Sequence, residues 1–326
     1  MKESLNKPRI SREKTCSRFA PVVGIMLSLV PGWAGAAEQL LFEAQKLDGQ
    51  GWSLEAPRLS VEPGPADALR LGVHAPRLRL SQPPVAVEDL ELSCPVFNLF
   101  EDGGSSCADG KLAFRLEPWK PVSGKMAWRH GEEGFELVVD LLAPGQGEIK
   151  GRLGGQERIQ RLKLELIGLA LEPFFKLLLP EWSGSGRLDA SSALEKGKGT
   201  GWRVDGSLRA SRFNFSDAEG LHVGEELAFS LSAEGQGLPD SPDGNFKVAL
   251  HSGQLYIDPF YLEFSPEAPF SLEARIEGSL TEERWRLEQL AGSYGGVMGF
   301  QGSGHFFSGG LEQLRMTFDV PQLGRF

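Results

Sequence analysis

Residues 161–174 read RLKLELIGLALEPF, and their first half sets the fold class of this chain. From residue 161 to residue 166, charged side chains alternate with leucines, so one face of a strand is apolar and the other is charged. The same period-two pattern recurs along the chain. It is clearest in residues 77–81, 111–116 and 285–290. Further strands are predicted at residues 135–142, 202–211, 226–233, 246–251, 254–264, 270–278 and 314–320. The sequence therefore predicts an all-β, antiparallel protein.

Glycine-rich stretches separate many of these runs. The chain has 41 glycines, which fits a large number of tight connections between strands. A phosphate-binding loop would need a following helix to point its backbone amides at the ligand, and none is predicted there. We therefore interpret three glycine-rich segments as turns, namely residues 184–186, 197–201 and 302–304.

The opening motif nearly recurs at the end of the chain, where residues 313–326 read QLRMTFDVPQLGRF. Each copy follows a glycine-rich stretch, residues 145–151 in one case and 295–302 in the other. The matched pairs are Leu162 with Leu314, Lys163 with Arg315, Leu164 with Met316, Leu166 with Phe318, Leu171 with Leu323 and Phe174 with Phe326. Such self-similarity is typical of stacked like units, so we expect the sheet to grow by adding similar β units.

One segment departs from the strand pattern. Residues 171–182 (LEPFFKLLLPEW) place apolar side chains three and four positions apart, which is the spacing of an amphipathic helix. Pro173 suits the first turn of this helix, and Pro180 ends it. We expect this short helix to plug one end of the β core; its polar face lacks the Lys/Arg cluster of a helix that binds a membrane surface.

The N-terminus has the three parts of a secretory signal peptide. Residues 1–18 carry six basic and two acidic side chains, a net charge of +4, and residues 19–30 (FAPVVGIMLSLV) are apolar. Pro31 and Gly32 break the apolar run, and residues 34–36 (AGA) form a small-residue cleavage site. We expect export by the general secretion route with cleavage after Ala36, and hence a periplasmic protein; an uncleaved signal would leave the chain anchored in the inner membrane.

Cleavage would leave Cys94 and Cys107 as the remaining thiols. The twelve residues between them, PVFNLFEDGGSS, are rich in turn formers. Two cysteines that close a short loop in an exported protein predict a disulfide. Two thiols alone do not make a metal site, so we expect no metal.

Charge and residue types exclude several functions. Removing the signal peptide changes the net charge from −10 to −14, which disfavours binding to nucleic acid or to anionic lipid surfaces. The five histidines are scattered, and no metalloprotease or serine-hydrolase motif is present. We expect no enzyme and no cofactor; a hydrolase with an unrecognised site is the alternative that substitution of the histidines and glutamates would test.

Three blocks resemble the AsmA-like group of bacterial envelope proteins, which includes the TamB and YdbH types. They are residues 169–190 (LALEPFFKLLLPEWSGSGRLDA), 201–215 (GWRVDGSLRASRFNF) and 221–230 (LHVGEELAFS), and the resemblance covers roughly residues 110–326. It implies an extended, twisted antiparallel sheet curled into an open, taco-like groove, with phospholipid acyl chains bound along it and no catalytic residues. This chain departs from that group in being short and in having a cleavable N-terminus.

The resemblance divides the chain into a signal peptide (residues 1–36), an N-terminal β region with the Cys94–Cys107 loop (37–110) and a β-groove region (111–326). We expect inward-facing residues to line the groove and bind acyl chains in envelope lipid transport. They are Leu112, Phe114, Leu116, Leu162, Leu164, Leu166, Phe213, Phe215, Leu227 and Phe229.

Two further expectations concern an alternative fold and a partner protein. In the alternative to a groove, the same residues pack inside a β-sandwich, as in an assembly module or secretion-system accessory of the envelope. In either case the final strand, residues 314–320, is expected to form an open sheet edge at which another envelope protein can add a strand.

Overall fold

The computed structural model describes residues 39–321 except residues 50, 66–67, 82–83, 102, 117–120, 144, 146, 198–200, 239–240, 280–282 and 308–309. The expected signal peptide, and Leu323 and Phe326 of the second motif copy, therefore lie outside the described residues. Residues 39–326 form one unit, and the boundary expected between residues 110 and 111 falls inside a strand of it.

The described part of this unit consists of strands and one short helix. The elements are β1 (Leu40–Glu43), β2 (Lys46–Gly49), β3 (Trp52–Glu55), β4 (Arg58–Pro63), β5 (Leu69–Ser81), β6 (Pro84–Leu99), β7 (Ser105–Arg115), β8 (Val122–Gly131), β9 (Gly134–Ala143), β10 (Gly147–Gly155), β11 (Ile159–Ala170), α2 (Glu172–Leu178), β12 (Ser183–Lys196), β13 (Trp202–Ser216), β14 (His222–Leu238), β15 (Asp243–Ile257), β16 (Phe260–Phe264), β17 (Phe270–Ser279), β18 (Arg284–Tyr294), β19 (Met298–Phe307) and β20 (Gly310–Asp319).

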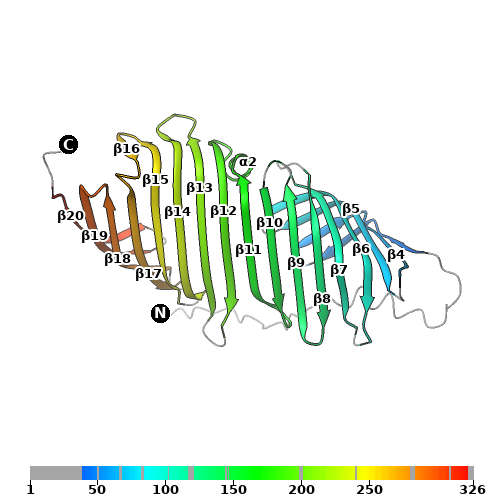
Figure 1. Cartoon of the computed structure of the whole chain (residues 1–326). Coiled ribbons are helices and arrows are strands. Elements are labelled where there is room, and N and C mark those ends of the chain that lie inside the picture. The colour runs from blue at the N-terminus through cyan, green and yellow to red at the C-terminus, as the bar shows by residue number, and fades with distance from the viewer. Residues whose placement is uncertain are drawn as a thin grey trace, which may run out of the picture. The chain divides into compact units, whose positions relative to one another are not determined.

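All the strands belong to a single 20-stranded sheet (Figure 1). From β5 to β15 each strand pairs antiparallel with the next along the chain. β15 then pairs with β16 along one half and with β17 along the other, and β17 to β20 continue the meander. At the opposite end, β5 pairs with both β3 and β4, which carry β2 and β1. No pairing among the described residues joins the two ends, so the sheet is open and the predicted all-β antiparallel fold is confirmed.

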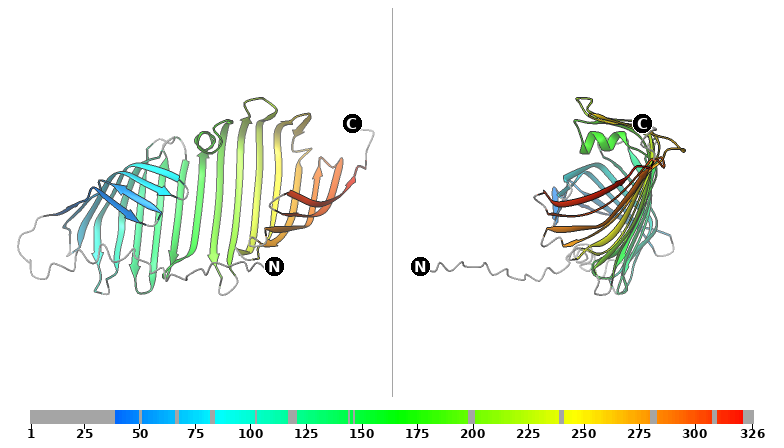
Figure 2. Two further views of the ribbon diagram at one scale, coloured as in Figure 1. Left: turned by 180° about the vertical axis from the view of Figure 1, so that it is seen from behind. Right: turned by 90° about the vertical axis from the view of Figure 1, so that its left-hand side faces the viewer.

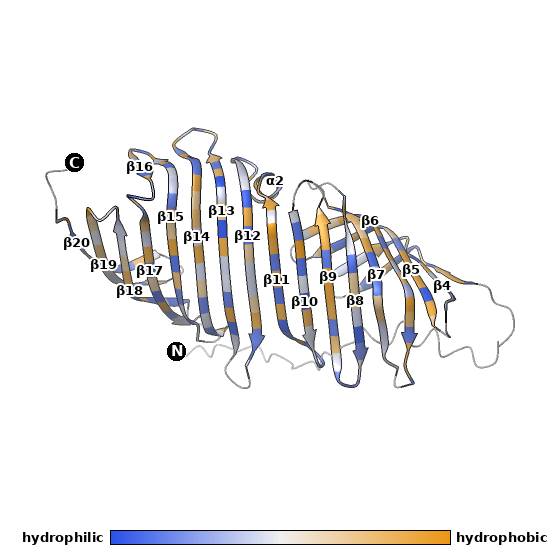
Figure 3. Cartoon of the chain, viewed as in Figure 1, coloured by the Kyte–Doolittle hydropathy of each residue, from blue (hydrophilic) through white to orange (hydrophobic). Residues whose placement is uncertain are grey.

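The register keeps the apolar side chains of neighbouring strands on the same face. Leu208 of β13 lies opposite Leu231 of β14, Leu231 lies opposite Val248 of β15, and Val248 lies opposite Leu272 of β17. Because side chains alternate along a strand, this register leaves the charged residues on the other face (Figure 3). We call the apolar side the inner face, because the sheet curls toward it and α2 lies on it (Figure 2).

A row of β-bulges bends the sheet. Five consecutive strands, β11 to β15, each contain a residue with positive φ beside a register shift, at Gly168, Gly186, Arg212, Glu226 and Gly253. Side chains satisfy the backbone there: the carboxylate of Asp189 accepts a hydrogen bond from the amide of Gly168 at 2.8 Å, and the side-chain oxygen of Asn214 accepts one from the amide of Glu226 at 2.8 Å. Bulges increase bending and twist, so this row creases the sheet and helps it to curl.

Two clusters of buried residues lie at the disulfide and next to it, and further buried residues such as Leu169, Ala210 and Leu227 lie along the sheet. Cys94 and Cys107 form the predicted bond, with their Cα atoms 6.0 Å apart, and pack with Phe97. A second cluster contains Val122 and Leu141 together with Ala143. Elsewhere, the described strands make their main contacts with their hydrogen-bonded neighbours, and α2 packs on β12. No second sheet covers the inner face in the described part of the chain, so the β-sandwich alternative is wrong.

Three details of the sequence-based prediction need correction. Residues 254–264 are not one strand, because the chain reverses at Asp258 and Pro259 to form the β15–β16 hairpin. Residues 184–186 and 302–304 are not turns but lie inside β12 and β19. The predicted helix is present as α2, but it lies between β11 and β12, midway along the strand order, and not at an end of it.

Candidate functional site

The inner face is the candidate site, and every lining residue predicted from the sequence lies on it. Strands β7, β11, β13 and β14 carry nine of the ten, and Leu116 directly follows β7. Leu227 is buried and the other nine are half-buried. They form no single pocket; they are separate parts of one apolar surface, joined by register through the strands between them.

One cluster of rings stands out on this face, beneath α2. Phe175 of α2 lies over Phe213, with ring centroids 5.8 Å apart, and Phe213 contacts Phe215 at 5.3 Å and Phe229 at 5.6 Å. Trp182, just before β12, extends the cluster to Phe215 at 5.9 Å and to His222 at 5.8 Å. We call these six rings the α2 aromatic cluster. Three of its members, Phe213, Phe215 and Phe229, were predicted as lining residues. Trp182 and His222 were not, because no local pattern in the sequence joins them to the strands.

A second run of rings crosses the C-terminal strands. Phe264 lies 6.3 Å from Phe270 and 6.0 Å from Tyr294, and Phe270 stacks at 6.3 Å on Phe300, which lies 6.2 Å from Phe318. Phe318, on β20, is 58% exposed. The apolar surface therefore continues to the last described strand and faces solvent there.

Inner-face glycines lie beneath several of these rings. A Cβ at Gly184 would overlap the ring of Phe175, and a Cβ at Gly292 would overlap the ring of Phe300. Glycine therefore lets a ring from a neighbouring element lie flat across the strand, as in the aromatic cover of strand glycines used in sheet design. At these positions the rings and the glycine backbone form a flat apolar surface on the inner face.

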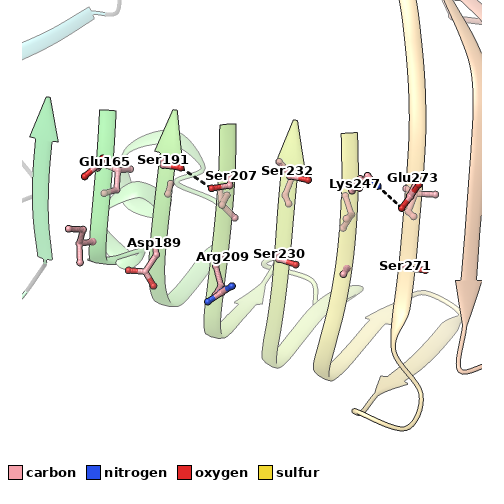
Figure 4. Close-up of a pocket in the computed structure, with 18 residues that line it drawn as sticks. Glu165, Asp189, Ser191, Ser207, Arg209, Ser230, Ser232, Lys247, Ser271 and Glu273 are labelled. Carbon is pink, nitrogen blue, oxygen red and sulfur yellow. Dashed lines mark hydrogen bonds and ion pairs between the residues drawn. The ribbon is translucent and has the colours of Figure 1, made fainter. Parts of the chain in front are cut away.

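The outer face is polar, and its side chains pair with one another. A shallow groove there is lined by Glu165, Ser191, Ser207, Lys247 and Glu273 among others (Figure 4). The hydroxyls of Ser191 and Ser207 are 2.9 Å apart, and Lys247 donates to Glu273 at 2.9 Å. These groups balance one another across the strands, which is how a solvated sheet face is stabilised.

The five histidines lie on five different strands of the described sheet. His251, on β15, contacts Ser230 on the outer face, with Nε2 2.9 Å from the hydroxyl oxygen. His130 lies on β8, several strands away. Among the described residues no group of three or more His, Cys, Asp and Glu side chains is placed to hold a metal ion.

A hydrogen-bonded Asp–His pair lies at the end of the α2 aromatic cluster. Asp217 accepts hydrogen bonds from Nδ1 of His222 at 2.6 Å and from the backbone amides of Leu221 and His222 at 2.9 and 3.2 Å. The hydrogen bond from the His222 ring, together with the two amides, lowers the pKa of Asp217 below its usual value. Since a carboxylate can only accept, the ring proton of His222 sits on Nδ1. The pair holds the turn between β13 and β14 beside Trp182.

No protein-family model, curated protein or solved structure matches this chain. Within the residues that the structure describes, no helix has the length and hydrophobicity needed to cross a membrane.

Proposed function

We propose that the inner face binds phospholipid acyl chains and relays them within the cell envelope, without chemical change to the lipid. The observation that supports this is the continuous apolar face of one open sheet, on which aromatic and aliphatic side chains stay partly exposed from β1 to β20. A water-soluble protein seldom leaves so large an apolar surface without a ligand or partner.

The energetics favour an extended apolar ligand. Each methylene moved from water onto an apolar surface contributes about 0.8 kcal/mol, so an acyl chain gains from contact along its whole length while its headgroup stays hydrated. Strands lie about 4.8 Å apart, so the row from β5 to β20 is roughly 65–70 Å long. One leaflet of a bilayer core is about 15 Å thick. The inner face is thus long enough for several acyl chains in succession.

The disulfide and the resemblance to AsmA-like proteins both support a lipid-binding role in the cell envelope. The Cys94–Cys107 disulfide indicates an oxidising, extracytoplasmic compartment, and the proposed location is the periplasm. The open curled sheet is the architecture that the resemblance to AsmA-like proteins implies, and that resemblance rests on the sequence blocks alone.

The strand-adding partner at the C-terminal edge stays a prediction. Among the described strands, β20 pairs only with β19, and its inner-face residues Leu311, Leu314 and Phe318 are exposed. An edge of this length and hydrophobicity is one to which another strand can add.

Site-specific photocrosslinking tests the proposed function. A photoreactive amino acid is placed at Phe229, on the inner face, and in a separate variant at the adjacent Ser230, on the outer face. In cells labelled with radioactive phosphate, we expect crosslinked phospholipid at position 229 and none at position 230. A second matched pair on β11 consists of Leu164 on the inner face and Lys163 on the outer face. It extends the test to a strand three places before β14 in the sheet.

Native mass spectrometry of the purified chain gives an independent readout. We expect masses of bound phospholipid that disappear after denaturation. Equal crosslinking on both faces, or a protein that carries no lipid in either experiment, would contradict the proposal.

A further inference from the structure

The tip of the β15–β16 hairpin exposes a group of large apolar side chains. Phe260 is 69% exposed and Tyr261 is 56% exposed, and Ile257 and Leu262 are exposed beside them. Leu221, in the neighbouring turn between β13 and β14, is exposed as well. We call these five residues the rim patch. It lies at one edge of the sheet, where β13 and β15 end and β14 begins.

At this tip the separation of an apolar and a polar face is lost. Ile257 pairs with Phe260 on the inner face, and Tyr256 pairs with Tyr261 on the outer face. The hairpin therefore presents apolar and aromatic side chains on both sides. A strand that only lines a groove needs them on one side, so the pattern is that of an element surrounded by an apolar medium at its tip.

Hydrogen bonds hold the patch in place. The amide of Asp258 donates to the carbonyl of Leu221 at 3.0 Å, which ties the hairpin tip to the β13–β14 turn. The hydroxyl of Tyr256 donates to the Asp258 carboxylate at 2.9 Å, and Asp217 accepts from the amide of Leu221. These hydrogen bonds fix the β13–β14 turn and the β15–β16 turn relative to each other, and the exposed side chains project from them.

The patch is continuous with the inner face. Ile257 lies opposite His222, whose ring contacts Trp182 in the α2 aromatic cluster. An acyl chain that crossed the rim at the hairpin would meet these rings next. The charges near the patch are mainly acidic and include Asp217, Glu219 and Asp258. Acidic groups disfavour an anionic membrane surface and leave a zwitterionic one as the partner.

We propose that the rim patch docks this protein onto a zwitterionic lipid bilayer, with the β15–β16 hairpin inserted at the headgroup level. Aromatic and aliphatic side chains at a membrane interface bind in proportion to the apolar area they bury. The role of the hairpin as the point where lipid enters rests on the proposed function, that the inner face binds acyl chains.

Vesicle flotation tests the docking. The full chain is mixed with phosphatidylcholine vesicles, and the rim double variant F260D/Y261D is compared with Q313D/T317D, which adds the same two charges at exposed outer-face positions of β20. We expect the partition coefficient to fall at least about tenfold for the rim variant and to stay within about twofold for the β20 variant.

Salt and lipid charge provide a second arm. We expect added salt to leave binding to phosphatidylcholine vesicles unchanged, and phosphatidylglycerol in the vesicles to weaken it. An otherwise wild-type chain carrying Phe260→Cys labelled with a polarity-sensitive fluorophore should be quenched by brominated lipid. This variant guards against misfolding of the double variants.

Equal losses in both double variants, or no quenching at position 260, would overturn the docking proposal. A wild-type chain that carries phospholipid but does not float with vesicles would overturn docking and leave the proposed function intact. A chain that floats through the rim patch but carries no phospholipid would leave docking intact and contradict the proposed function.

Discussion

At the residue scale, glycine decides how closely strands approach on the concave face. Gly124 of β8 has no room for a side chain, because a Cβ there would overlap the carbonyl oxygen of Asp140 on β9. Gly206 of β13 lies on the same face with room to spare, since the nearest atom to its Cβ would be the Ser191 carbonyl oxygen at 3.6 Å. Close strand packing therefore requires a glycine at position 124, whereas the space at position 206 would accept a methyl group.

Alanine substitution separates the two cases. We expect Gly124→Ala to destabilise the protein by about 1–3 kcal/mol, because the backbone of β9 must move. Gly206→Ala, the control, should be neutral or stabilising by about 0.4–1 kcal/mol, because it restricts the unfolded chain. Urea denaturation measures both, and equal effects would show that the inner face is less crowded at Gly124 than the structure indicates.

Asp217 gives the rim a pH dependence with a definite sign. Its pKa is lowered in the folded protein, chiefly by the hydrogen bond from His222, so its ionised form stabilises the fold at pH values above the unfolded pKa of about 3.9. This contribution is lost as the pH falls through that value toward the folded pKa. We therefore expect the stability difference between wild type and Asp217→Asn to be constant above about pH 5 and to shrink below about pH 4.

Urea denaturation at a series of pH values measures this difference. A difference that stays the same down to the acid limit of folding would contradict the assigned role of the Asp217 carboxylate. His222→Gln supplies a matched test, since it removes the ring donor and keeps a side chain of similar reach.

At the scale of elements, α2 is held to the sheet by few contacts. The helix has seven residues, which is too short to be stable alone, and Phe175 anchors it over Gly184 and Phe213. We expect Phe175→Ala to release α2 while the sheet stays folded. Hydrogen exchange of the backbone amides in residues 172–178 should become much faster.

Lys176→Ala is the control for that substitution. Lys176 is exposed and donates to Glu172 at 2.7 Å, an i,i+4 pair that solvent screens and that contributes little to stability. Exchange in α2 should change little in this variant. If both substitutions accelerate exchange equally, the contact of Phe175 with the α2 aromatic cluster is not what holds the helix.

The hairpin of β6 and β7 depends on its disulfide. Cys94 and Cys107 are 13 residues apart. The register of β6 with β5 shifts beside Cys94, and the register of β7 with β8 shifts after Cys107, so the flanking ladder is irregular at each cysteine. Limiting the unfolded chain by a loop of this size contributes about 3 kcal/mol. We expect the double variant C94A/C107A to lose about that amount in urea denaturation, and reductant to destabilise wild type but not the variant.

At the scale of the whole described sheet, the inner face lacks the second layer that most β proteins place over it. We expect an amphiphile with one acyl chain, lysophosphatidylcholine, to raise the melting temperature by roughly 5 °C at about 100 times its Kd, since a ligand that binds only the folded state stabilises it. Glycerophosphocholine, which has the headgroup without the chain, is the control and should have no effect. Calorimetry measures both, and equal shifts would indicate headgroup binding.

Local pattern was enough to predict much of this protein. The alternation in residues 161–166 set the strand type and its apolar face, the 171–182 segment predicted the helix, and the spacing of Cys94 and Cys107 in an exported chain predicted the disulfide. The ten lining residues could be assigned to one face because the strand period is two and neighbouring strands stay in register.

Three features depended on the tertiary structure, because they arise between strands. Period two alone cannot distinguish a face covered by a second sheet from an open one. Gly184 and Gly302 look like turn residues until a ring or a neighbouring strand is placed against them. Trp182, His222 and Ile257 come from separate segments, and only the register of β12 to β15 brings them to one rim. The sequence by itself determined the antiparallel strand type and the apolar side of the strands; the long-range pairing, which depends on contacts between distant segments, decided that this side is open and where its rim lies.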